Sequence, residues 1–267
     1  TATFYSQAGE ETGLFQFELE SGPALALAPT KELPDPRVER QGDHLLLEAN
    51  GVSLALSLAD GQIKALEKDG VSYLSSGPKA CFDRPYTGLD AQPGWGWYEE
   101  YAKVREQKLK TEKPQILLGG GEVQVRFRLV QQQEEIPPIF GQLTYLFRGD
   151  GTLSLEADFH LDRSYRAVPR VGLELTLPEG FEELAYFGRG QNECYPDRMM
   201  SAPLAVYHST VTAQHFPFVP PSETGGHEQT RWLSLERIGG GKLLVQSETP
   251  FHFDALHHRI EDLKSCA

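Results

Sequence analysis

A polar loop at residues 188–198 carries the side chains best suited to bind a ligand. The loop reads Gly-Arg-Gly-Gln-Asn-Glu-Cys-Tyr-Pro-Asp-Arg and follows the apolar run 184–187. Its two glycines allow a sharp turn at the end of a strand, and the carboxylate, amide and phenol groups can form hydrogen bonds. Loops of this composition are usually only turns, so the loop alone identifies no function.

Histidines are concentrated in the last quarter of the chain, which raises the possibility of metal binding or acid–base catalysis. Neither HExxH nor HxH spacing occurs, and neighbouring residues of a strand face opposite sides. We therefore predict no metal and no cofactor. The six histidines concerned are His208, His215, His227, His252, His257 and His258.

Carboxylate pairs offer no catalytic centre. Hydrolysis of a glycoside needs two carboxyl groups that face each other across the scissile bond. Adjacent residues on a strand or helix do not face each other, so we expect these acids to be exposed to solvent. No catalytic residue is predicted in this chain. The adjacent acids are Glu99-Glu100, Glu134-Glu135, Glu182-Glu183 and Glu261-Asp262.

Trp95 and Trp97 are the candidates for stacking against a sugar ring, because an indole face packs well on the apolar face of a sugar. Both follow a loop rich in glycine and proline. Packing in the core is the alternative role for the same side chains.

The net charge of −13 argues against nucleic acid or an anionic membrane as a partner, since both require a basic surface. We expect a soluble protein without a signal peptide, cytoplasmic or periplasmic. The three cysteines, Cys81, Cys194 and Cys266, are far apart and predict neither a disulfide framework nor a zinc site.

Strand signals recur from residue 44 onward and predict an all-β fold. Alternation over 52–58 and 63–66, around Asp60-Gly61, predicts a β-hairpin. One short helix is expected at 97–104. Further strands are expected at 123–129, 143–147, 153–159 and 171–177.

Four segments, taken in order, resemble the C-terminal large β-sandwich of the glycoside hydrolase family 2 β-galactosidases, called the small-chain domain. Residues 82–90 resemble FWRAPTDND, and residues 188–198 resemble GxGPxENYxDR. Residues 218–225 resemble YxxPxENG, and residues 250–256 resemble a later strand of that domain. The chain departs from the pattern at Gln191, where the family has Pro, at Cys194, where it has Asn, and at Gly88 and Leu89.

The resemblance implies a large antiparallel β-sandwich of the supersandwich type, similar to galactose mutarotase, over residues 36–267 and truncated at its C-terminus. Residues 1–35 would be the tail of a preceding immunoglobulin-like module and a linker. The catalytic glutamates would lie in a TIM barrel of the parent protein, outside this chain. That barrel and its galactoside substrate are the implied partners, and an oligomer is compatible with the resemblance.

The resemblance also assigns roles to residues of this chain. Gln191, Asn192 and Glu193 would border the mouth of the barrel. The residues expected to hold the structure are Arg84, Asp90, Tyr195, Asp197 and Arg198, with Asp197 and Arg198 forming an ion pair.

Two other functions remain open at this point. An aldose 1-epimerase would need a histidine acid and a glutamate base in one pocket, and His208, His215 or His227 with Glu223 are candidates. A carbohydrate-binding module would use Trp95 and Trp97 as its platform.

Overall fold

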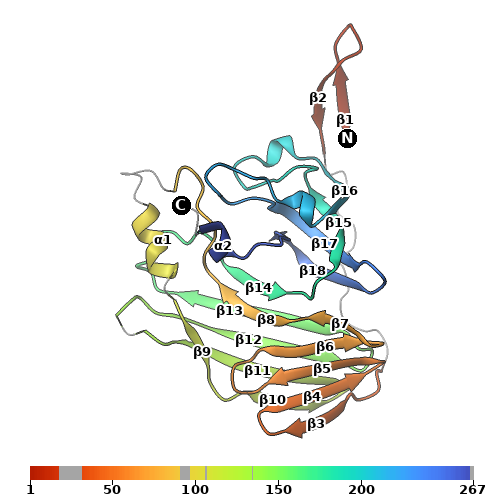
Figure 1. Cartoon of the computed structure of the whole chain (residues 1–267), viewed down its shortest axis with the longest axis vertical. Coiled ribbons are helices and arrows are strands. Elements are labelled where there is room, and N and C mark those ends of the chain that lie inside the picture. The colour runs from red at the N-terminus through yellow and green to blue at the C-terminus, as the bar shows by residue number, and fades with distance from the viewer. Residues whose placement is uncertain (18–31, 91–96, 106, 134, 265–267) are drawn as a thin grey trace. The chain divides into compact units, whose positions relative to one another are not determined.

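The fold of the chain is all-β, with several antiparallel sheets and few helices (Figure 1). The chain divides into two compact units, one formed by Thr1–Ala28 and Gly180–Ala267 and the other by Pro29–Glu179. Within the part described, no helix is long and apolar enough to cross a membrane. The computed structural model describes residues 1–17, 32–90, 97–105, 107–133 and 135–264.

The first sheet of the 29–179 unit is a five-stranded meander, in which each strand pairs with the next in sequence. It contains the predicted hairpin, which turns at Asp60 and Gly61 between β5 and β6. The strands are β3 (Arg37–Gln41), β4 (His44–Ala49), β5 (Val52–Ser57), β6 (Ile63–Lys68) and β7 (Val71–Leu74).

The second sheet of this unit has the order β10-β11-β12-β13, and β9 also pairs with β11. Buried side chains of both sheets form one apolar cluster that includes Leu56, Phe127 and Tyr145, so the two sheets pack as a sandwich. The strands are β9 (Leu109–Thr111), β10 (Gln115–Gly119), β11 (Glu122–Gln131), β12 (Ile139–Arg148) and β13 (Leu153–Leu161).

A two-stranded sheet and one helix complete the unit. Strand β8 (Ser76–Cys81) pairs with β14 (Gly172–Thr176), and helix α1 spans Trp97–Arg105. Val104 of α1 packs with Phe82 and Ile139 in a second buried cluster. The predicted helix and the strands expected at 123–129, 143–147, 153–159 and 171–177 are thus confirmed, with small shifts of their ends.

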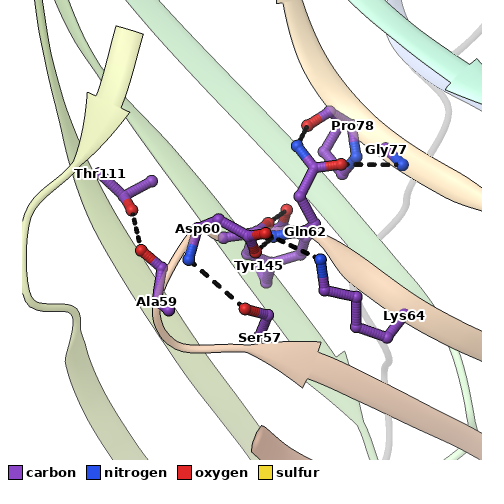
Figure 2. Close-up of polar contacts among 10 residues, drawn as sticks. Ser57, Ala59, Asp60, Gln62, Lys64, Gly77, Pro78, Thr111 and Tyr145 are labelled. Carbon is purple, nitrogen blue, oxygen red and sulfur yellow. Dashed lines mark hydrogen bonds and ion pairs between the residues drawn. The ribbon is translucent and has the colours of Figure 1, made fainter. Parts of the chain in front are cut away.

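The turn between β5 and β6 is fixed by polar contacts to three other segments (Figure 2). The Tyr145 hydroxyl, on the fully buried side chain of β12, donates a hydrogen bond to the carbonyl of Gly61. The Gln62 amide donates to the Pro78 carbonyl at 3.1 Å, and the Thr111 hydroxyl donates to the Ala59 carbonyl at 2.8 Å. The hairpin, which belongs to the first sheet, is therefore connected to β9 and β12 of the second sheet and to β8.

Asp60 adds charge to the same turn, because its carboxylate accepts from Lys64 at 2.8 Å and from the backbone N–H of Gln62 at 3.0 Å. Partial burial opposes ionisation, but these hydrogen bonds and that to Ser57 lower the pKa of Asp60 overall.

The unit formed by residues 1–28 and 180–267 is built on a four-stranded sheet with the order β16-β15-β17-β18. A hairpin of β1 and β2 belongs to it, and the Gln16 side chain donates to the Leu204 carbonyl at 2.8 Å. The elements are β1 (Ala2–Tyr5), β2 (Glu11–Phe15), β15 (Phe181–Arg189), β16 (Leu204–Thr210), β17 (His227–Arg237), β18 (Lys242–Phe253), α2 (Ile260–Lys264) and two 3-10 turns, η1 (Met199–Ser201) and η2 (Thr212–Gln214).

We predict that Tyr145→Phe lowers the free energy of unfolding by about 1–3 kcal/mol, because the buried Gly61 carbonyl loses its donor. Urea unfolding followed by tyrosine fluorescence or circular dichroism measures this change. Tyr5→Phe, at an exposed tyrosine of β1, is the control and should change stability little. Equal stability of the Tyr145→Phe variant and the unchanged chain would contradict the role of this hydrogen bond.

Candidate functional site

The polar loop begins where β15 ends, and both of its glycines are required by close contacts. A Cβ on Gly188 would lie 2.6 Å from the Thr230 Oγ1 and 3.2 Å from the Thr230 Cα on the neighbouring strand β17. Gly190 has a φ of +89°, and a Cβ there would lie 2.3 Å from the Asn192 carbonyl oxygen. Larger residues would push the loop away from the sheet.

Tyr186, on β15, holds the polar loop of residues 188–198 in place. Its hydroxyl donates to the Gly190 carbonyl at 2.6 Å, and its side chain is only 1% exposed. Its ring centroid lies 4.4 Å from that of His227 and 5.3 Å from that of Phe253. Burial raises the pKa of Tyr186, so the phenol stays protonated and keeps donating.

Glu193 joins this loop to a second one. Its carboxylate accepts from the Arg198 guanidinium within the loop and from the backbone N–H of Gly225 at 3.2 Å. The Arg198 guanidinium also lies 4.9 Å from the centroid of the Tyr195 ring. Glu193 thereby connects two segments that are about 30 residues apart in the sequence.

The predicted ion pair between Asp197 and Arg198 is therefore wrong. The chain turns at this point, with the Arg198 N–H donating to the Tyr195 carbonyl at 3.0 Å. The Arg198 side chain folds back over Tyr195 toward Glu193, whereas Asp197 is exposed. Side chains of successive residues in a turn diverge, so sequence adjacency did not bring the charges together.

The second loop is held closely against the first. The Cys194 N–H donates to the Gly226 carbonyl at 2.7 Å, and the Gly226 N–H donates to the Tyr195 hydroxyl at 3.3 Å. A Cβ on Gly226 would lie 2.6 Å from the Tyr195 ring and 2.7 Å from the His252 ring. Only glycine permits this approach.

The end of β18 supplies the third segment. The His252 Nδ1 lies 2.9 Å from the Glu228 Oε1, and the His252 Nε2 lies 3.9 Å from the Asp254 Oδ2. One ligand atom from each of Glu223, His252 and Asp254 lies within 4.8 Å of the other two, and we call these residues the His252 cluster. Three of the four segments that resemble the family thus lie in the unit formed by residues 1–28 and 180–267. They are residues 188–198, 218–225 and 250–256.

The electrostatic character of this site is negative. Burial first, and then the carboxylates of Glu223, Glu193 and Asp254, raise the pKa of Tyr195, so its hydroxyl remains neutral. Glu223 is buried at 7% exposure, and Asp254 is half-buried. Gln191 and Asn192 are exposed at the outer side of the loop, where they can contact another molecule.

The other histidines do not join the site. His208 is exposed, the ring of His215 lies at a tilt against that of His258 with centroids 4.5 Å apart, and His257 lies 2.8 Å from a carboxylate oxygen of Glu182. Trp95 lies outside the described residues, and Trp97 is the first residue of α1. Neither Cys81 nor Cys194 forms a disulfide, and Cys266 lies outside the described residues.

Arg84 and Asp90 form a separate polar site in the 29–179 unit. The Arg84 Nη2 lies 2.8 Å from the Asp90 Oδ2, and both side chains are largely buried. The same carboxylate oxygen accepts from the Thr87 N–H at 2.8 Å, and the Asp90 N–H returns a bond to the Thr87 carbonyl. The pair therefore fixes the conformation of the loop after β8.

A match to a known family accounts for the order of these segments. The family model described as "Beta galactosidase small chain" matches residues 48–267. The chain belongs to the β-galactosidase small-chain family. The resemblance inferred from residues 82–90, 188–198, 218–225 and 250–256 is thus confirmed.

Three relatives that match this chain are each called β-galactosidase. The protein of Staphylococcus xylosus is 30% identical over 61% of this chain and 16% of its own length. That of Streptococcus thermophilus is 26% identical over 84% of the chain and 22% of its length. That of Priestia megaterium is 24% identical over 98% of the chain and 25% of its length. The chain therefore spans a quarter or less of these relatives.

The His252 cluster was missed by the sequence analysis. Its signal was the spacing His252-x-Asp254, which puts two side chains on the same side of an extended strand. Neither HExxH nor HxH describes a histidine followed two residues later by an aspartate. The contribution of Glu223 had no local signal, because it comes from a loop almost 30 residues earlier.

We predict that the unit formed by residues 1–28 and 180–267 loses stability as the pH falls from about 6.5 to about 4. His227 is 1% exposed, and its burial lowers its pKa to about 4 from an ordinary value of 6.5. Within that window the unfolded chain binds a proton that the folded chain does not, so the free energy of unfolding decreases by up to about 3 kcal/mol.

Urea unfolding at pH 7, 5.5 and 4 measures this decrease. His227→Gln should flatten the dependence on pH, whereas His208→Gln, at an exposed histidine of β16, should leave it intact. A decrease of the same size in the His227→Gln variant would show that other groups cause it.

Proposed function

We propose that this chain is the accessory β-sandwich part of a β-galactosidase, which borders an active site supplied by a TIM barrel of the parent protein. The observation that carries the proposal is the family match over residues 48–267, together with the share of 16% to 25% of the relatives that the chain covers. A region of this extent is one part of a larger enzyme, and the catalytic glutamates belong to another part.

The contact with substrate is assigned to the exposed amides of Gln191 and Asn192. Their loop is fixed at both ends, by the Tyr186 hydroxyl on Gly190 and by Glu193 on Gly225. A loop fixed in this way loses little conformational entropy when its side chains bind a ligand. Amide side chains carry both donors and acceptors, as sugar hydroxyls require.

Glu193 supports this loop and is not assigned a contact with the sugar. Its carboxylate is already engaged by Arg198 and by the Gly225 N–H. Tyr195, Arg84 and Asp90 likewise hold loop conformations in their respective units. We also propose that the β-sandwich is of the supersandwich type, and that residues 1–35 are the tail of a preceding immunoglobulin-like module and a linker.

An aldose 1-epimerase is less well supported. Such an enzyme needs a histidine acid with access to the sugar, and a pKa near neutral pH serves that role best. His227 is the candidate nearest in sequence to Glu223, but it is 1% exposed and its Nε2 lies 2.6 Å from the Gln214 Oε1. Its lowered pKa keeps it neutral at pH 7.

The first test uses the 267-residue chain alone. We expect no release of o-nitrophenol from o-nitrophenyl β-D-galactoside, and no acceleration of the interconversion of galactose anomers by polarimetry. Turnover of the galactoside by the purified chain would overturn the accessory role. Acceleration of anomer interconversion would support the epimerase instead.

The second test replaces the matching region of the Priestia megaterium β-galactosidase with this chain. We expect the chimera to hydrolyse the galactoside, and we expect Gln191→Ala with Asn192→Ala to raise KM by about 5- to 50-fold through lost hydrogen bonds. Gln246→Ala, at an exposed residue of β18, is the matched control. A chimera that assembles like the intact relative but lacks activity would contradict the proposal.

A further inference from the structure

We propose that the His252 cluster is a binding site for a divalent transition-metal ion of the Zn²⁺ or Mn²⁺ type. The ligands would be one carboxylate oxygen each of Glu223 and Asp254 and one ring nitrogen of His252, which we assign as the Nε2 because the Nδ1 already contacts Glu228. The proposal differs from the expectation drawn from the sequence, which was that the chain binds no metal. It is independent of the proposed function, because all three ligands and their supports lie in residues 193–254.

The distances fit a common ion. Donor atoms of histidine and carboxylate lie about 2.0–2.2 Å from zinc, so two of them on one ion are at most about 4.4 Å apart. The three ligand atoms of the cluster already lie within 4.8 Å of one another, and the His252 Nε2 is 3.9 Å from the Asp254 Oδ2. Closing around an ion therefore needs only small side-chain rotations.

The tautomer of His252 is set for metal binding. The Nδ1 of its ring faces the Glu228 Oε1 at 2.9 Å, and an ionised carboxylate can only accept. The Nδ1 consequently carries the hydrogen, and the Nε2, which lies 3.9 Å from the Asp254 Oδ2, keeps a lone pair for a metal ion. A carboxylate behind a ligating histidine is a recurrent arrangement, which fixes the ring and makes the ligand more basic.

The ligands are positioned by contacts that do not depend on an ion. His252 and Asp254 share one side of the extended chain at the end of β18. The segment that carries Glu223 is fixed two residues later, where the Gly225 N–H donates to Glu193 and the Gly226 N–H donates to Tyr195. Because Gly226 has no Cβ, the rings of Tyr195 and His252 can both lie close to its backbone.

The charges favour a cation at this place. Glu223, Glu228 and Asp254 surround His252, and Glu223 is 93% removed from solvent. Negative charges this close to one another attract a divalent cation, and the attraction is stronger where the groups are partly removed from water.

The site is in contact with solvent. The side chains of His252 and Asp254 are each 28% exposed. An ion could enter from solvent and complete its coordination with water. Three protein ligands with nitrogen and oxygen donors suit Zn²⁺ and Mn²⁺ better than Ca²⁺ or Mg²⁺, which prefer oxygen ligands alone. The ion would join the loop containing Glu223 to the end of β18.

The test uses the 267-residue chain stripped of metal with a chelator and titrated with ZnCl₂ or MnCl₂ by calorimetry. We expect one ion per chain and a rise in the thermal unfolding midpoint, because an ion that binds only the folded state stabilises it. His252→Gln, Glu223→Gln and Asp254→Asn should each weaken binding by more than 10-fold. Glu228→Gln should weaken it by about 10- to 100-fold although it removes no ligand.

Two matched controls separate this site from other histidines and acids. His257→Gln removes a second histidine–glutamate contact, with Glu182, and Glu248→Gln removes an exposed acid of the same strand β18. Both should bind as the unchanged chain does. The proposal is overturned if neither ion binds at one per chain, or if His252→Gln binds with unchanged affinity while His257→Gln does not.

A second measurement on the unchanged chain covers the case in which a variant fails to fold. Substoichiometric Mn²⁺ should broaden the NMR signals of the His252 ring before those of His208 or His257, because paramagnetic broadening falls steeply with distance. Broadening of the other rings first, with His252 unaffected, would place the ion elsewhere and refute the assignment.

Discussion

The polar site depends on the close approach of three chain segments at Gly226. A Cβ at this position would overlap the rings of both Tyr195 and His252. Because the space is left open, Tyr195 receives the Gly226 N–H, and the end of β18 reaches the segment that carries Glu223. Because Gly226 has no Cβ, side chains from three distant parts of the sequence can lie close together.

The loop that carries Tyr195 is supported from two directions. Beneath it, the buried Tyr186 fixes Gly190 through its hydroxyl and packs on His227 and Phe253. Beside it, Glu193 links the loop to Gly225. The buried, neutral ring of Tyr186 and the paired carboxylate of Glu193 both hold this loop in one conformation. The exposed amides of Gln191 and Asn192 are therefore carried by a fixed backbone. In the other unit, Tyr145 plays the comparable part by fixing the β5–β6 turn (Figure 2).

Strands and turns could be predicted from the sequence because their signals are local. Alternating apolar residues marked β11, β12 and β13, and Asp60-Gly61 marked a hairpin turn. The pairing of Arg198 could not be predicted in the same way, because the direction of a side chain in a turn depends on the neighbours that surround it. Adjacency in the sequence favours Asp197 as its partner, whereas Arg198 pairs with Glu193. The division of the chain near Gly180 also had no local signal.

The all-β class, the helix near Trp97 and the β-galactosidase small-chain family could be read from the linear chain, because periodicity and ordered motifs are properties of the sequence. Which charged groups meet depended on the three-dimensional packing. It buried His227, paired Arg198 with Glu193 and placed Glu223 beside His252. These outcomes depend on how separate strands and loops pack in space, and the spacing of residues along a chain does not encode that packing directly.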